Sequence, residues 1–227
     1  MEYKVADIVR EINIALDKNM SSEALSNLGD VDTLTLDEII ASKIEDAART
    51  VTLNAPYTLL DGGKAFGDVV GWDMQAGYGP GRIVLPDDFL RLLVFQMSDW
   101  SRPVTEPITE DDARYALQRS RFPGVRGCPQ SPVVALAKQP VGLVLEFYSC
   151  TQGENVYVKM ARYVPIPKKF IYEGEARIDL CEKLLRPIIY YAAYLVAISI
   201  DNATQAVSLR RQSYELMGMT DGSSTEG

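Results

Sequence analysis

The sequence contains no histidine among its 227 residues. Histidine is the commonest general base and a frequent metal ligand near neutral pH. Its absence therefore excludes Ser-His-Asp and Cys-His catalytic sites and metals bound by imidazole, but not chemistry that uses carboxylate, lysine or tyrosine side chains. Cysteine is also scarce: Cys128, Cys150 and Cys181 are widely spaced and form no CxxC pair. We therefore expect reduced thiols, without a disulfide framework or a zinc site.

Basic residues are outnumbered by acidic ones. The chain has 23 Lys and Arg against 31 Asp and Glu, which gives a net charge of −8. Nucleic-acid binding usually requires a basic surface, so sequence-specific binding of nucleic acid is not expected. The apolar run 187–200 is shorter than the roughly 20 residues of a membrane span. The charged N-terminal segment 1–19 does not resemble a secretory signal, so we expect synthesis in the cytoplasm without membrane insertion or export.

The composition is that of a folded protein, with 47% hydrophobic residues and a mean hydropathy of −0.06. Hydrophobic residues at helical spacing predict a helix over 3–18. Thr35 followed by Glu38 has the pattern of a capping box, which predicts a second helix running to about residue 51. Near the C-terminus the same spacing predicts helices over 176–186 and 188–217, with a break at Pro187 and an end at Gly218.

Glycine and proline interrupt any helical period in the middle of the chain, where apolar segments have the length of strands. Pro86, Asp87 and Asp88 predict a turn between the first two segments. Strict alternation in the second segment places Leu92 and Phe95 on opposite faces. A short helix is predicted over 113–120, and the last three strands should form an antiparallel meander. The five predicted strands are 82–85, 89–97, 132–137, 141–149 and 156–164.

These patterns together predict an α+β fold in which N- and C-terminal helices form a helical bundle with a central antiparallel β insertion. The predicted division is a helical bundle of residues 1–65 with 174–219, a β-rich insertion of residues 66–173 and a flexible tail of residues 220–227. The tail is polar and too short to bury a core of its own.

Two acidic groups are the candidates for carboxylate or metal chemistry: Asp87 with Asp88, and the run Glu110 to Asp112. Adjacent residues on an extended chain point to opposite faces, so Asp87 and Asp88 favour a turn over a catalytic pair. The second group suits the first turn of a helix, where the helix dipole favours acidic side chains. We therefore predict no catalytic, cofactor-binding or metal-binding residue. A carboxylate-dependent, metal-binding enzyme remains the alternative.

Tyrosine and arginine gather near the C-terminus, and these residue types often anchor protein interfaces. The alternative for the tyrosines is ordinary core packing, and a cytoplasmic protein-binding module is a further alternative for the whole chain. The predicted partner-binding residues are Tyr190, Tyr191, Tyr194, Arg210, Arg211, Tyr214 and Met217.

Four segments, in their order along the chain, carry a resemblance to a known family. They are VADIVREINIAL, AARTVTLNAPYTLL, IVLPDDFLRLLVFQMSDW and LLRPIIYYAAYLVAISIDNATQAVSLRRQSYELMG. In this order the sequence resembles the head-to-tail adaptor proteins of tailed bacteriophages, which are also called connector or ring proteins. The β segment between these helices is larger than in the smallest adaptors.

The resemblance implies a non-enzymatic virion structural protein without a cofactor. Such a protein forms a homo-oligomeric ring, a dodecamer, at the head-tail junction, and DNA passes through the ring. Its partners are the portal protein on one side and the tail or further ring proteins on the other. The resemblance also implies that residues 203–227 reach the portal. An acidic surface suits a DNA conduit because it does not hold the polyanion.

Overall fold

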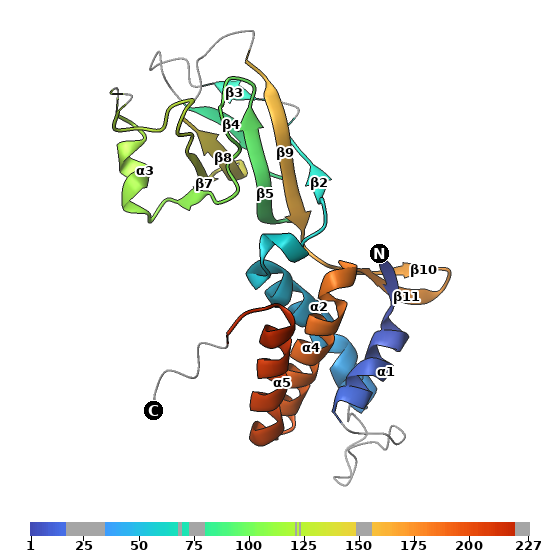
Figure 1. Ribbon diagram of the computed structural model, residues 1–227. Helices are drawn as coiled ribbons and strands as arrows, with labels where there is room; N and C mark the ends of the chain where they lie inside the picture. Colours follow the sequence, from blue (N-terminus) through green and yellow to red (C-terminus); the bar gives the residue numbers. More distant parts are fainter. Residues whose placement is uncertain are drawn as a thin grey trace, which may run out of the picture. The chain divides into compact units, whose positions relative to one another are not determined.

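The computed structural model describes residues 1–16, 35–67, 70–72, 80–120, 122, 124–148 and 156–220 (Figure 1). The chain divides into two compact units. The first, the helical unit, comprises Met1–Asp61 and Pro167–Gly227, and the second, the β unit, comprises Gly62–Ile166. The predicted tail lies outside the described residues apart from Thr220, as does Cys150.

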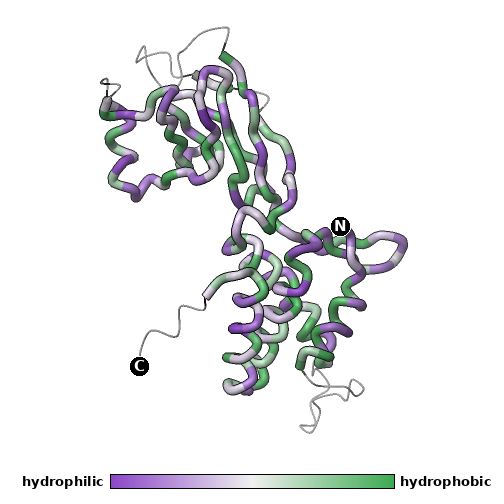
Figure 2. Tube along the Cα trace, viewed as in Figure 1, coloured by the Kyte–Doolittle hydropathy of each residue, from purple (hydrophilic) through white to green (hydrophobic). Residues whose placement is uncertain are grey.

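The helical unit is built on four helices whose apolar stripes meet in one core. Its helices are α1 (Val5–Ala15), α2 (Leu36–Asn54), α4 (Leu185–Ser199) and α5 (Ala203–Leu216), with short 3-10 turns at Tyr57–Leu59 and Glu182–Leu184. Figure 2 shows hydrophobic positions recurring along these helices, and Ile12, Ile40, Ile44 and Ile188 are fully buried.

The predicted capping box is confirmed. The Thr35 hydroxyl accepts a hydrogen bond from the Glu38 amide, and the Glu38 carboxylate accepts one from the Thr35 amide. These two bonds satisfy donors that the first turn of α2 would otherwise leave without partners. The N-terminus of α2 is therefore fixed by the chain next to it.

The single helix predicted over 188–217 is wrong, because the chain turns back between α4 and α5. Asp201 has a positive φ of 57°, and the Asn202 side chain caps α5 by accepting from the Gln205 amide. Pro187 does not break the helix, since it lies in the first turn of α4, where the missing N–H has no partner to lose. The Ser213 hydroxyl donates to the Pro187 carbonyl at 2.8 Å and joins the two helices. No helix in the described part of the chain is long and apolar enough to cross a membrane.

The predicted single central β insertion is wrong, because strands also belong to the helical unit. There β1 (Glu2–Lys4), β11 (Glu175–Asp179) and β10 (Lys169–Tyr172) form an antiparallel sheet in the order β1-β11-β10. The helix predicted over 176–186 is therefore also wrong. Pairing with β1, more than 170 positions away, outweighs the local helical pattern, and Glu173 and Gly174 with positive φ make the tight turn of a β-hairpin.

The β unit is a pair of sheets. A five-stranded sheet has the order β3-β4-β8-β7-β6 and a three-stranded sheet the order β2-β9-β5. A helix, α3 (Ala113–Leu117), also lies in this unit, so the helices are not confined to the ends of the chain. The strands are β2 (Lys64–Ala65), β3 (Gly71–Trp72), β4 (Gly81–Val84), β5 (Phe89–Met97), β6 (Ile108–Thr109), β7 (Val134–Gln139), β8 (Gly142–Phe147) and β9 (Val158–Pro165).

The predicted meander is wrong for its last strand. β7 and β8 pair antiparallel as expected, but β9 crosses to the other sheet and pairs with β5. Side chains from both sheets then form one aromatic core, in which the Phe95 and Phe147 rings lie 5.1 Å apart. The two sheets therefore share one interior.

The predicted turn at Asp87 and Asp88 is confirmed, and Phe89 begins β5 directly after it. The strict alternation predicted for β5 is wrong. The register shifts between Leu92 and Val94, so Leu92 and Phe95 are both buried in the same core. A β-bulge places an extra residue in one strand, which reverses the alternation beyond it.

Candidate functional site

Four of the predicted partner-binding residues form a cluster on α4 and α5, here called the Tyr-Arg cluster: Tyr191, Tyr194, Arg210 and Tyr214. The rings of Tyr191 and Tyr194, one turn apart on α4, lie 5.2 Å apart. From α5, the Arg210 guanidinium lies 5.9 Å from the Tyr194 ring centre and 5.6 Å from that of Tyr214. The turn at Asp201 folds α5 back along α4 and so brings these side chains together.

The other three predicted residues lie outside this cluster. Arg211 is exposed and pairs with Glu215 one turn along α5, at 3.3 Å. Met217 is buried in the helical core, which makes it a packing residue in this chain. Tyr190 is half-buried against the same core. Their positions in the sequence alone did not show that these three residues lie outside the cluster.

The Tyr-Arg cluster is suited to binding a protein surface. Each of its tyrosines packs one side against the helical core and is only half-buried, so each is held in place and still accessible. Burial raises the pKa of Tyr191 above its usual value, so its phenol stays neutral. Ordered tyrosines and an arginine stacked on them present a large amphipathic area with little side-chain freedom left to lose. Such a surface can anchor a partner.

Asp88 serves a structural role in the β unit. Its carboxylate accepts hydrogen bonds from the Tyr163 hydroxyl at 2.6 Å and from the Lys64 ammonium at 2.8 Å. Burial acts to raise the pKa of Asp88, but the bonds from Lys64 and Tyr163 outweigh it and lower the pKa. Burial, together with the bond to Asp88, raises the pKa of Tyr163 to about 12. Asp88 therefore links the turn before β5 to β9 and β2.

The second acidic group also makes local contacts. Asp112 caps α3 by accepting from the Arg114 amide and pairs with the Arg114 guanidinium, whose hydrogen bonds lower the pKa of Asp112 to about 2. Glu110 accepts from the Lys138 amide. Among the described residues, no three His, Cys, Asp or Glu side chains lie close enough together to hold a metal ion. These carboxylates fix a helix end and a strand.

A buried carboxylate that was not among the predicted residues organises one face of the five-stranded sheet. Glu146 on β8 is only 3% exposed. It accepts hydrogen bonds from the hydroxyls of Tyr115 at 2.9 Å and Tyr148 at 2.5 Å and from the Gln139 amide at 2.8 Å, and the Arg82 guanidinium lies 3.3 Å away. Burial, followed by the contact with Glu146, raises the pKa of both tyrosines.

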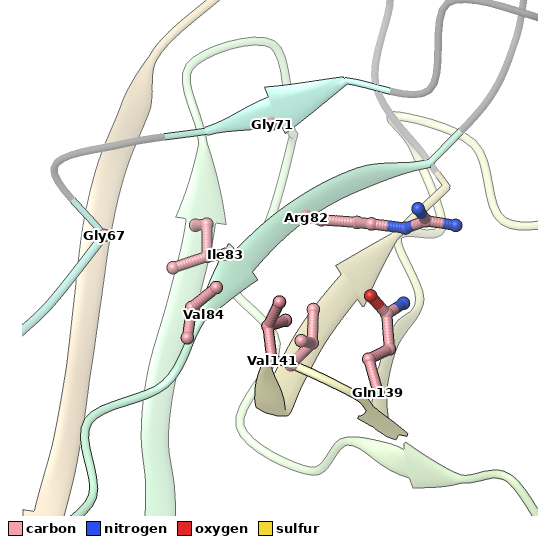
Figure 3. Close-up of a pocket in the computed structure, with 8 residues that line it drawn as sticks. Gly67, Gly71, Arg82, Ile83, Val84, Gln139 and Val141 are labelled. Atoms are coloured by element: carbon pink, nitrogen blue, oxygen red, sulfur yellow. The ribbon is translucent and has the colours of Figure 1, made fainter.

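A pocket of about 500 Å³ lies beside this network, on the same five-stranded sheet. Figure 3 shows the Arg82 and Gln139 side chains on one side of the pocket and those of Ile83 and Val84 on the other. The lining is mainly apolar, with one cation and one amide. The lining residues are Gly67, Gly71, Arg82, Ile83, Val84, Gln139, Val141 and Val144.

One signal in the sequence pointed to this region. Glu146 interrupts the apolar run 141–147, and a carboxylate inside a buried strand needs several donors. The donors come from β4, α3 and β7, and no local pattern predicts which of them meet. Comparison with known proteins gives no further guide: no protein-family model and no curated protein matches this sequence.

Proposed function

We propose that this protein is a virion structural protein, a subunit of a homo-oligomeric adaptor ring between the portal and the tail of a tailed bacteriophage. The observation that carries the proposal is the Tyr-Arg cluster on α4 and α5. It lies at the C-terminal end of the chain, within and beside the segment that the adaptor resemblance assigns to the portal. The proposed role of the cluster is to bind the portal protein.

The chemistry of the cluster supports this role. Tyrosine and arginine dominate the energetic centres of protein interfaces, because they bury a large area and still donate hydrogen bonds. In a ring every copy repeats the same contact, so even a weak single contact becomes stable through multivalency. The hairpin of α4 and α5 is held together by a buried apolar interface and by the bond from Ser213 to Pro187. The surface is therefore ordered before it binds.

The charge of the chain supports a conduit for DNA. With a net charge of −8 on each copy, the ring repels the phosphate backbone and does not retain it. The chemistry of the described carboxylates is consistent with a structural role, since Asp88, Glu110, Asp112 and Glu146 all fix local structure. In this role the ring lets DNA pass and connects the portal to the tail.

Two neighbouring arginines provide a matched test of the portal contact. Arg210→Glu places a negative charge among the tyrosines, whereas Arg211→Glu makes the same change on the exposed residue next to it. Wild-type protein mixed with portal complexes of the same phage should form ring-bound particles in mass photometry. Arg210→Glu should weaken this binding at least tenfold, about 1.4 kcal/mol, and Arg211→Glu should change it less than about threefold.

Three outcomes would count against the proposal at different levels. A wild-type protein that joins neither portal nor tail complexes, and that is missing from purified virions, contradicts the adaptor function. Binding only to a host protein would favour the cytoplasmic protein-binding module. If wild type binds portal and both variants bind equally well, the adaptor function stands, and another surface makes the contact.

A further inference from the structure

The β10–β11 hairpin of the helical unit carries an exposed apolar tip. Its register places Ile171 on the same face of the sheet as Ile178, which is fully buried against the helices. Ile171 lies nearer the tip, where that cover ends, and is 73% exposed. The neighbouring Tyr172 is half exposed, and the hairpin extends beyond the helices of its unit (Figure 1). Ile171 therefore lies on the core-facing side of the sheet without being covered by the core.

The opposite face of the hairpin carries Phe170 and Tyr172 beside the charged residues Glu175 and Arg177. There Glu175 pairs with Lys4 at 2.9 Å and with Arg177 at 3.6 Å, and Arg177 also stacks over the Tyr172 ring. These contacts hold the hairpin in shape. The apolar face at the tip is the one that a partner can cover.

The pocket of the β unit is complementary to this tip, because its lining is mainly apolar. The face of the five-stranded sheet that turns away from the aromatic core is covered at one end by α3 and Tyr148. At the other end no described helix covers it, and the pocket lies there between Val144, which is buried, and the exposed side chains Val84 and Val141. Val141 is 67% exposed. Ile171 and Val141 are the two most exposed large apolar side chains in the described residues.

We propose that the hairpin tip of one copy, Ile171 with Tyr172, inserts into this pocket on a second copy of the chain. The inference rests on the ring function proposed above and names the contact that joins neighbouring copies. The tip also carries the exposed acidic residue Glu173. The pocket presents Arg82, whose side chain is 41% exposed although it pairs with Glu146, so opposite charges would meet at the contact. The amide of Gln139 lies on the same side as Arg82.

The arrangement of the two surfaces determines the kind of assembly. The tip and the pocket are different surfaces, so a pair of copies that uses one contact leaves one free tip and one free pocket. If the free tip and the free pocket engage further copies, the contacts are heterologous, and they close as a ring where the rotation between copies permits closure. If two copies exchange tips reciprocally, the same contact gives a closed twofold dimer. The ring proposed above requires the first arrangement.

Disulfide trapping between copies tests this contact directly. Ile171→Cys and Val141→Cys are made as separate variants, mixed in equal amounts and oxidised mildly, both alone and bound to portal. The mixture should give at least tenfold more disulfide-linked dimer than either variant alone, which measures the background from the native cysteines. The double variant should give a ladder of multimers. The matched control mixes Val141→Cys with Val207→Cys, a site on α5 that is 65% exposed and belongs to neither surface.

The outcomes separate this inference from the function on which it rests. If the mixture links no better than the control pair, either alone or on portal, the tip does not occupy the pocket and the inference is overturned, whether or not portal binding persists. If the tip and pocket variants link efficiently but the wild type never joins portal or tail, the contact between copies holds and the adaptor function fails. Linking within one chain is recognised because the double variant would then stay monomeric.

Discussion

The two units of this chain fill their interiors in different ways. The described core of the helical unit consists of Val, Ile, Leu, Ala and Met, and its buried polar side chains are Thr52 and Ser213. The β unit has Phe95, Trp100 and Phe147 at its centre and buries Gln96, Gln118 and Glu146. One interior is aliphatic and nearly free of polar groups, whereas the other combines aromatic rings with a buried charge.

The difference follows from how helices and sheets complete their backbone hydrogen bonds and cover their faces. A helix closes its own backbone hydrogen bonds, so four amphipathic helices need only to bring their apolar stripes together. A five-stranded sheet has two faces, and the second face here is covered by α3, a helix of only five residues. Such a short helix is not stable alone. Tyr115 fixes it to the sheet through Glu146.

The largest expected effect is therefore the loss of Glu146. Glu146→Ala leaves the hydroxyls of Tyr115 and Tyr148 and the Gln139 amide without their acceptor, and Arg82 without its carboxylate. Breaking a buried, hydrogen-bonded charge cluster should destabilise the β unit by about 4 kcal/mol. Trp72 and Trp100 are the only tryptophans in the sequence and both belong to this unit. Tryptophan fluorescence during urea unfolding therefore measures its stability.

The exposed Glu106 of the same unit offers the matched control. Glu106→Ala should change the urea midpoint by no more than an ordinary surface substitution does, within about 0.5 kcal/mol. Equal effects of the two substitutions would show that the polar network does not support α3, and the contrast between the two interiors would lose its physical basis.

In the helical unit the corresponding prediction is a cavity. Ile44→Ala removes a fully buried side chain of α2 and should cost about 3 kcal/mol. Circular dichroism at 222 nm measures the unfolding of the helical unit, because α1, α2, α4 and α5 all belong to it. The same change at Ile14, which is 54% exposed on α1, should cost less than about 1 kcal/mol. A similar loss at both positions would argue against the aliphatic core described here.

The sequence predicted features that depend on neighbouring residues and missed features that depend on distant strands. The capping box at Thr35, the helix start that it fixes and the turn at Asp87 depend on neighbouring residues, and they were predicted correctly. Most of β11 was predicted as part of a helix over 176–186, because its partner β1 lies at the other end of the chain. The bulge in β5 was also not predicted, since a register shift depends on the partner strand β9.

The same limit applies to the functional surfaces. The sequence singled out Tyr191, Tyr194, Arg210 and Tyr214 as partner-binding residues, but it did not predict that they meet, because the predicted helix over 188–217 had no turn at Asp201. It could not exclude Met217, whose burial depends on the fold of the α4–α5 hairpin. The pocket was not predicted at all, since its residues come from strands that meet only through sheet pairing.

The smallest expected effect is that of Asp88. Its contribution to the stability of the β unit depends on pH, which separates it from the buried apolar contacts of both units. Its folded pKa lies below the ordinary value of 3.8. The ionised carboxylate therefore stabilises the β unit above about pH 4, and this contribution is lost as the pH falls through the folded pKa. Asp88→Asn should lower the stability at pH 7 by about 1 kcal/mol, because the bonds from Tyr163 and Lys64 lose their charge assistance.

Tryptophan fluorescence melts from pH 7 to pH 2.5 test this prediction. The difference between wild type and Asp88→Asn should be constant above pH 5 and shrink toward zero in the acid range. The adjacent exposed Asp87 provides the control, since Asp87→Asn removes the same charge without removing those two bonds. A difference that persists unchanged at pH 2.5 would mean that the geometry of the turn, and not the ionised carboxylate, joins β5 to β9. The β unit would then depend on one buried charge, at Glu146.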